Sequence, residues 1–146
     1  MIDETVFERF LRTRHSVRHF RSDPVPQALV RRLLKMASLA PSAHNAQPWR
    51  FAVLLDAGKR RQLAEAMAVA FRCDLTSDNV PQARVDALVD ASMQMIGGAP
   101  VVVVLSLSMR EMDRYPDVRR QEAERDLAVQ SVALAGGQLL LAAHAV

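Results

Sequence analysis

Apolar residues recur at every third or fourth position in several parts of the chain, and polar residues occupy the positions between them. This spacing is typical of amphipathic helices that bury one face. In residues 4–13, for example, Val6, Phe7, Phe10 and Leu11 share one stripe. Prolines, glycines and short polar runs separate these stretches. The pattern predicts helices over residues 4–13, 27–40, 59–72 and 82–96.

Two shorter apolar runs predict β-strands. WRFAVLL covers residues 49–55, and PVVVVLSL covers residues 100–107 as a continuous run, which is typical of a strand buried on both faces. The basic segment 14–21 is expected to be extended. Because helices separate the strands, we expect one α+β domain over residues 1–146. Its fold should have three layers, in the order helix, sheet, helix, with three or four strands in the sheet.

The last twenty residues, 127–146, carry no charge and follow a helix start predicted near Gln121. Their length suits a membrane span, but scattered polar residues and the pair Gly136-Gly137 favour the buried centre of a soluble fold. So much apolar helix beside a narrow sheet predicts a homodimer that buries this helix. No helix terminator precedes Val146, so we expect the intact domain to continue.

Composition excludes several classes of protein. Of 146 residues, half are hydrophobic and 24% are charged, which excludes disorder. A single cysteine, Cys73, excludes a disulfide framework, and no residues stand at metal-ligand spacing. A net charge of +3 is too small to indicate nucleic-acid binding. Acidic residues replace the basic start of a signal peptide, so we expect a cytoplasmic protein outside the membrane.

The first candidate binding segment contains Arg14, Ser16 and Arg18 at alternate positions. In an extended chain, such residues project from one face. Two guanidinium groups and a hydroxyl on one face suit the oxygens of a phosphate. The alternative is a solvated basic strand, because basic runs are common on surfaces.

The second candidate is the loop between Pro41 and Pro48. Ser42, Asn45 and Gln47 lie within it, and the two prolines restrict its backbone. Amide side chains offer both a donor and an acceptor, which suits the polar edge of a heterocycle or a ribityl chain. The alternative is an ordinary turn-rich loop whose amides face water.

Together these segments resemble a known family. RHSVRHF at 14–20 and APSAHNAQPWRF at 40–51 are followed by APVVVV at 99–104 and LLLAAH at 139–144. The four segments, in this order, resemble the nitroreductase family of FMN enzymes. Residues 115–131 are further similar to the flavin domain of cofactor F420 biosynthesis proteins.

The resemblance implies an FMN-dependent oxidoreductase that passes a hydride from NAD(P)H through flavin N5 to a nitroaromatic, a quinone or a similar small acceptor. It implies that the FMN phosphate and ribityl hydroxyls are bound by Arg14, His15, Ser16 and Arg18, and that Pro41, Ser42, Asn45 and Gln47 lie beside the ring or the ribityl chain. The flavin supplies the chemistry, so no catalytic acid or nucleophile is expected. In this family the fold continues past the LLLAAH helix, so we expect the fold to be incomplete at Val146.

Two other functions stay open. One is a flavin-dependent reductive step in the biosynthesis of an F420-type cofactor. The other is a non-catalytic domain whose basic patch (Arg14, Arg18, Arg31 and Arg32) binds acidic partners or nucleic acid. Among the remaining residues, we expect Trp49 to pack in the core, the thiol of Cys73 to be buried, and Glu124 to lie on a solvated helix face.

Overall fold

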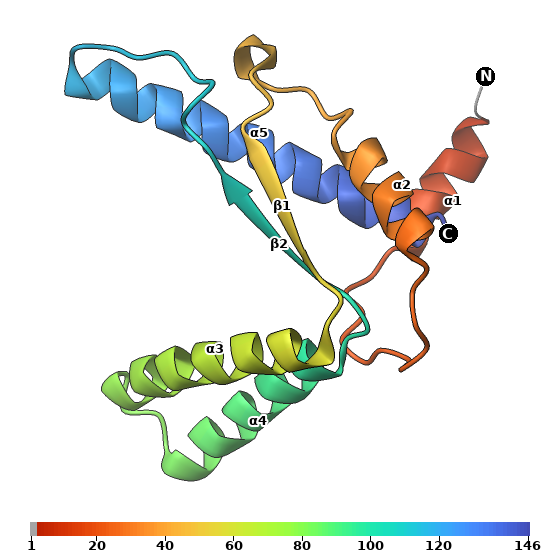
Figure 1. Ribbon diagram of the computed structural model, residues 1–146, viewed down its shortest axis with the longest axis vertical. Helices are drawn as coiled ribbons and strands as arrows, with labels where there is room; N and C mark the ends of the chain where they lie inside the picture. Colours follow the sequence, from red (N-terminus) through yellow and green to blue (C-terminus); the bar gives the residue numbers. More distant parts are fainter. Residues whose placement is uncertain (1–2) are drawn as a thin grey trace. The chain divides into compact units, whose positions relative to one another are not determined.

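The computed structural model describes residues 3–146 and contains five α-helices, one short 3-10 helix and two strands in that range (Figure 1). The strands form a two-stranded sheet, so the expectation of three or four strands is wrong for the described residues. In chain order the elements are α1 (Glu4–Thr13), α2 (Gln27–Ala37), η1 (Ala43–Asn45), β1 (Trp49–Leu54), α3 (Ala57–Ser77), α4 (Gln82–Gly98), β2 (Val102–Leu107) and α5 (Val118–His144).

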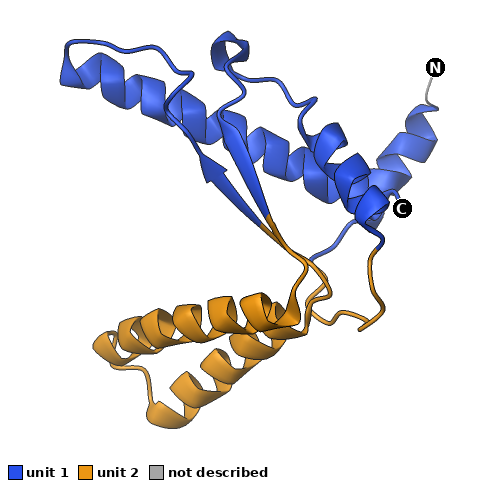
Figure 2. Ribbon diagram, viewed as in Figure 1, with its two compact units in different colours: residues 1–16, 26–52, 104–146 blue, residues 17–25, 53–103 orange. Residues whose placement is uncertain are grey.

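The chain divides into two compact units (Figure 2). The first unit combines the N-terminal segment up to Ser16 with residues 26–52 and 104–146. The second unit combines residues 17–25 with residues 53–103. The two units have separate cores, and a single domain over residues 1–146 stays a prediction.

Aspartates set the start of three helices. The carboxylates of Asp3, Asp56 and Asp117 accept hydrogen bonds from the N–H groups three residues later, at 3.1, 2.8 and 2.9 Å. Such caps satisfy N–H groups that the first turn of a helix leaves unpaired. Because Asp56 caps α3, this helix begins two residues earlier than predicted. The backbone N–H and the guanidinium of Arg120 hold the pKa of Asp117 below its ordinary value.

The core of the first unit forms around Trp49. This side chain is 6% exposed and packs with Ala40 and Ala135, which confirms its predicted role in the core. Phe51 and Leu105 pack against the same cluster from the two strands. Burial along β2 alternates, and Val104 is 40% exposed. The prediction that this strand is buried on both faces is therefore wrong for the single chain.

Helix α5 is buried along one narrow stripe. Its buried residues are Glu124, Ala128, Ser131, Ala135 and Ala142, most of them small. Small side chains allow close approach: a Cβ on Gly136 would lie 3.0 Å from Leu105. Outside the stripe the helix is half-buried or exposed, so the expectation that residues 127–146 form the buried centre of the fold is wrong for one chain. By length and hydropathy alone, α5 is also able to cross a membrane.

The second unit contains a hairpin of α3 and α4, which pack against each other around Val85 and Val89. Helix α3 extends to Ser77, several residues past its predicted end, and α4 extends through Gly98. Cys73 lies on the solvent side of α3 and is exposed, so the prediction of a buried thiol is wrong.

Replacement of Trp49 by Ala will lower the free energy of unfolding by about 3–5 kcal/mol, because it leaves a cavity in the core of the first unit. Denaturant unfolding followed by circular dichroism measures this loss. Val118→Ala is the control, since Val118 is 71% exposed. Equal stabilities of the two variants would show that Trp49 does not organise this core.

Candidate functional site

The loop between Pro41 and Pro48 has an unusual backbone. His44, Asn45 and Gln47 have φ angles of 54°, 54° and 48°. This left-handed region is uncommon for residues with a side chain, although Asn tolerates it better than most. Each such residue costs about 1–3 kcal/mol and persists only where neighbouring contacts fix it. The loop therefore depends on the contacts that hold it.

Two serine hydroxyls bind the backbone of this loop. The hydroxyl of Ser42 accepts a hydrogen bond from the N–H of Gln47 at 3.1 Å, which closes the loop on itself. The hydroxyl of Ser131 in α5 accepts from the N–H of Ala43 at 3.1 Å and donates to the carbonyl of Leu127 at 2.7 Å. Ser131 therefore joins the start of the loop to the buried stripe of α5.

Glu124 provides a second link between the loop and α5. It is 2% exposed, so the prediction of a solvated face is wrong. Its Oε1 accepts from the N–H of Asp113 at 3.1 Å, and its Oε2 lies 3.6 Å from Nε2 of His44. His44, Asp113 and Glu124 each offer one atom that could ligate a metal ion, and these three atoms lie within 4.8 Å of one another. Glu124 lies four and seven residues before Ala128 and Ser131, so all three share one face of α5. This helical spacing was the sequence signal that could have indicated the burial of Glu124.

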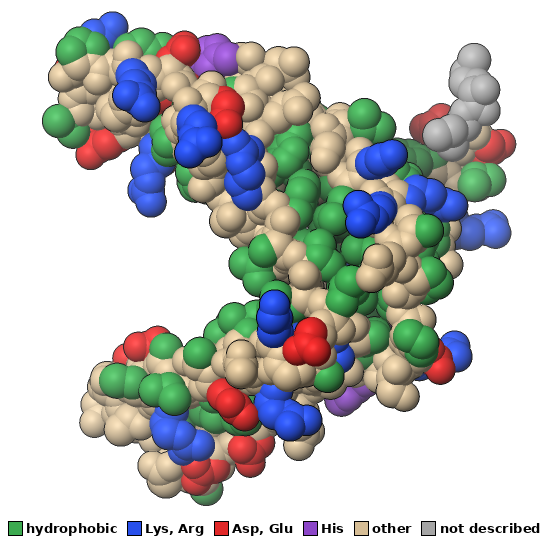
Figure 3. Space-filling view, viewed as in Figure 1, with side chains coloured by type: hydrophobic (Ala, Val, Ile, Leu, Met, Phe, Trp, Pro, Cys, Tyr) green, Lys and Arg blue, Asp and Glu red, His purple; other side chains and the backbone are tan. Residues whose placement is uncertain are grey.

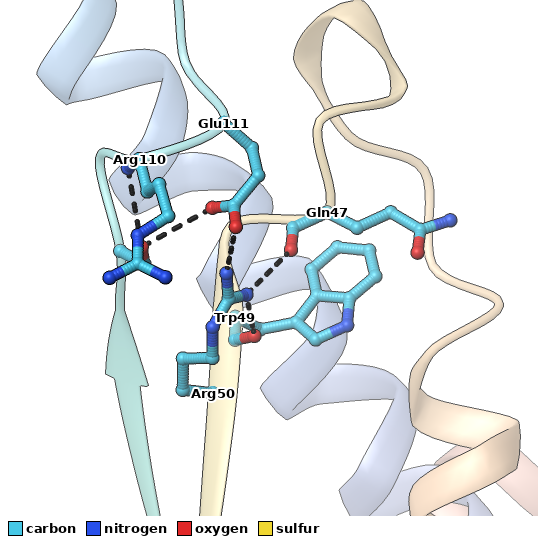
Figure 4. Close-up of polar contacts among 6 residues, drawn as sticks. Gln47, Trp49, Arg50, Arg110 and Glu111 are labelled. Carbon is cyan, nitrogen blue, oxygen red and sulfur yellow. Dashed lines mark hydrogen bonds and ion pairs between the residues drawn. The ribbon is translucent and has the colours of Figure 1, made fainter.

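The far end of the loop contacts the segment that follows β2 (Figure 4). Nη1 of Arg50 donates to the carbonyls of Trp49 at 2.8 Å and Gln47 at 3.3 Å, and Nη2 pairs with Glu111. The hydroxyl of Ser108 donates a hydrogen bond to Oε2 of Glu111 at 3.2 Å. The sequence did not reveal this pair, because 50 and 111 are far apart along the chain.

The Arg14 segment begins where α1 ends. The Thr13 hydroxyl donates to the carbonyl of Phe10 at 3.0 Å, so its oxygen is left to accept from Nε2–H of His144, also at 3.0 Å. The rings of Phe10 and His144 are 4.9 Å apart. The C-terminal end of α5 thus fixes the residue that precedes Arg14, whose backbone is extended at φ −69° and ψ 128°.

The predicted site residues have different surroundings. Arg14 is half-buried, and within residues 3–146 no side chain pairs with its guanidinium. His15 bonds through Nδ1 to the carbonyl of Thr13 at 3.1 Å. Ser16 belongs to the first unit and Arg18 to the second. A common face for Arg14, Ser16 and Arg18 therefore stays a prediction.

The four predicted loop residues all belong to the first unit. Ser42 is half-buried, while Pro41, Asn45 and Gln47 are exposed. The side-chain amide of Gln47 lies 3.5 Å from Oδ1 of Asn45. The structure therefore brings Ser42, Asn45 and Gln47 together in one turn with amide groups on its surface.

The first unit also has an apolar groove of about 440 Å³. Its lining includes Val6, Phe7 and Phe10 of α1, Met36 of α2, Leu39 just after α2, and Leu141 of α5. Basic side chains gather elsewhere, over the N-terminal end of α5 (Figure 3). This part of α5 contains Arg119, Arg120 and Arg125.

Comparison with known proteins assigns the chain to a family. The family model described as "Nitroreductase family" matches residues 11–146. The chain belongs to the nitroreductase family. The resemblance found in the motifs is thereby confirmed. The match includes both candidate segments and every element from α2 to α5.

Individual relatives match shorter parts of the chain. A 5,6-dimethylbenzimidazole synthase of Rhodospirillum rubrum is 37% identical over 89 residues, which are 60% of this chain and 41% of that protein. An NADH dehydrogenase of Thermus thermophilus is 51% identical over 53 residues, which are 36% of this chain and 26% of that protein. The matches therefore span less than half of these curated relatives.

Solved structures confirm the predicted fold class. The FMN-dependent nitroreductase NfnB from Mycobacterium smegmatis, solved in complex with NADPH, aligns with a TM-score of 0.67 and 23% identity. The alignment covers 97% of this chain and 71% of that chain. This chain therefore has a nitroreductase-like α+β fold.

Replacement of Ser131 by Ala will lower the free energy of unfolding by about 1–3 kcal/mol, because the N–H of Ala43 loses its acceptor. It will also speed amide hydrogen exchange at Ala43. Ser77→Ala is a matched control, since the Ser77 hydroxyl also donates to the carbonyl four residues back but holds no loop. If both variants exchange at the wild-type rate, Ser131 does not hold the loop.

Proposed function

We propose that this protein is an FMN-dependent oxidoreductase that transfers a hydride from NAD(P)H to a small acceptor such as a nitroaromatic or a quinone. The chain belongs to the nitroreductase family, and the observation that carries the proposal is its turn over residues 42–47. Three residues of this turn have positive φ angles, and Asn45 and Gln47 lie on its surface. The FMN and NADPH named for the structurally similar NfnB support the same cofactor and donor.

The chemistry of the side chains fits FMN. Arg14, whose guanidinium pairs with no side chain among residues 3–146, and Arg18 offer charge-assisted donors to a phosphate, and the hydroxyl of Ser16 adds a short donor. His15 joins this group through its backbone or ring. Pro41, Ser42, Asn45 and Gln47 would lie along the ring and the ribityl chain, since amides pair with alternating donors and acceptors.

The residues of this chain would bind and orient rather than react. FMN, when bound, supplies the hydride transfer between NAD(P)H and the acceptor. The arginines would fix the anionic end, and the turn at residues 42–47 would fix the ring edge. A turn that is held before binding loses little conformational entropy on binding, which favours affinity.

A second candidate function is a flavin-dependent step in cofactor biosynthesis, which includes the reductive step of an F420-type pathway. The relative named 5,6-dimethylbenzimidazole synthase favours a biosynthetic role, because its match covers 60% of this chain. Both candidates require flavin and use the same residues. They differ in the acceptor: the first predicts turnover of nitroaromatics or quinones with NAD(P)H, and the second predicts none.

Replacement of Arg14 and Arg18 together by Ala will weaken FMN binding by about a hundredfold or more, since each lost charged hydrogen-bonding group is worth about 1.5–3 kcal/mol. Quenching of flavin fluorescence during titration measures the affinity. The exposed pair Arg31→Ala and Arg32→Ala on α2 is the control. The wild-type complex is expected to be yellow and to bleach with NAD(P)H.

Unchanged affinity in the Arg14 and Arg18 variant would refute the phosphate site. No flavin binding by the wild type, together with binding to nucleic acid that falls steeply with salt, would establish the basic-patch function instead.

We further propose that the protein is a cytoplasmic homodimer in which a second copy covers the apolar faces of α1 and α5. The groove described above and the exposed residues Leu134 and Leu140 on α5 support this assembly. A contiguous apolar patch on the surface of a soluble protein is typical of an interaction site. A two-fold dimer buries the same surface on both copies.

Replacement of Leu140 by Glu will therefore convert a dimer of 16.2 kDa chains into a monomer, because it places a charge on a surface that the dimer buries. Size-exclusion chromatography with light scattering measures the mass. Val69→Glu, at a 73% exposed position on α3, is the control. A monomeric wild type would refute the dimer, and a requirement for detergent would favour a membrane role for α5.

A further inference from the structure

The residue before Pro48 has a backbone that two independent effects disfavour. Gln47 has a φ of 48°, which is rare for a residue with a long side chain. It also precedes a proline, whose ring favours an extended conformation in the residue before it. Gln47 is therefore expected to leave this conformation unless neighbouring groups hold it.

The carbonyls around Pro48 show what holds it. Three consecutive carbonyls each accept a hydrogen bond from outside the turn. Arg50 donates to the carbonyls of Gln47 and Trp49, and the backbone N–H of Ser108 donates to the carbonyl of Pro48 at 2.7 Å. The chain on both sides of Pro48 is thus fixed to one guanidinium and one backbone N–H.

The guanidinium of Arg50 is itself fixed (Figure 4). Nη2 pairs with Glu111, and the other oxygen of Glu111 accepts from the hydroxyl of Ser108, which accepts from the N–H of Arg110 at 3.2 Å. The guanidinium, the carboxylate and the hydroxyl therefore form one connected network. We name Arg50, Glu111 and Ser108 the Arg50 clamp.

We propose that Arg50 is a positioning residue for the cofactor: through the Arg50 clamp it holds Gln47 in the left-handed conformation that presents the Gln47 amide to flavin. This inference rests on the proposed function. Arg50 acts through Gln47 and is not itself a ligand. A guanidinium suits this role, because its rigid planar fork directs donors at two carbonyls and a carboxylate, whereas the ammonium of lysine is a point charge on a flexible stem.

Global stability is not the main role of the clamp. The side chains of Arg50 and Glu111 are 46% and 39% exposed, and ion pairs in such positions contribute little to folding. The first unit has a separate core around Trp49, and the hydroxyl of Ser131 binds the other end of the loop. Loss of the clamp is therefore expected to change the local turn more than the fold.

The test is a double-mutant cycle on FMN affinity, measured by quenching of flavin fluorescence with the full chain. Arg50→Ala is expected to weaken binding by about tenfold, and Arg50→Lys nearly as much. In the background of Gln47→Ala the same change at Arg50 is expected to weaken binding by less than about twofold, because the side chain that it positions is gone. A general loss of structure would lower affinity equally in both backgrounds.

Arg72→Ala is the matched control. Arg72 is 42% exposed and pairs with Asp86 on the second unit, but it contacts no loop carbonyl, so its loss should leave FMN affinity unchanged. Melting temperatures of the Arg50 and Arg72 variants should fall within about 4 °C of wild type.

The outcomes separate the two proposals. If the wild type binds no FMN, the proposed function fails. If the wild type binds FMN and Arg50→Ala binds it equally well, or weakens it equally with and without Gln47, only the positioning role is overturned.

Discussion

The candidate site depends on a turn that its own residues do not favour. His44, Asn45 and Gln47 adopt positive φ angles without a glycine among them, so the energy that holds the turn comes from its neighbours. At one end the hydroxyl of Ser131 in α5 binds it and Glu124 lies 3.6 Å from His44, and at the other end Arg50 and Ser108 bind it. The fold thus supplies the geometry and the turn supplies the amides.

Helix α5 makes these contacts possible because its buried stripe consists mostly of small residues. Ala128, Ala135 and Ala142 allow close packing, and Ser131 and Glu124 lie on the same stripe. Gln138, also on α5, donates to the carbonyl of Met36 at 2.7 Å and joins the helix to the end of α2. At its C-terminal end His144 contacts Thr13. One helix therefore contacts the flanks of both candidate binding segments.

The sequence predicted the elements whose pattern is local. The helices over α1 and α2, the strand β1 and the buried Trp49 all follow from periodicity and proline positions. The number of strands was overestimated, because the extended segment near Arg14 joins no sheet among residues 3–146. Burial of β2 and α5 was overestimated, because an apolar run shows what can be buried and not what one chain covers.

The candidate site was predicted in part, and the missing part depends on tertiary contacts. The residue types of the loop pointed to Ser42, Asn45 and Gln47, since local polarity and two prolines mark a binding turn. Neither the positive φ angles nor the partners Glu124 and Glu111 follow from local sequence. The family resemblance supplied the expected cofactor. Residue spacing alone did not decide whether the basic segment binds phosphate or is a solvated surface strand.

The central claim is that contacts within the chain fix the turn before any cofactor binds. Amide hydrogen exchange of residues 43–47, measured without and with FMN, tests it most directly. The N–H groups of Ala43 and Gln47, which bind the two serine hydroxyls, should be protected already in the free protein, with little gain on adding FMN. Fast exchange in the free protein, with protection only after FMN is added, would contradict the account.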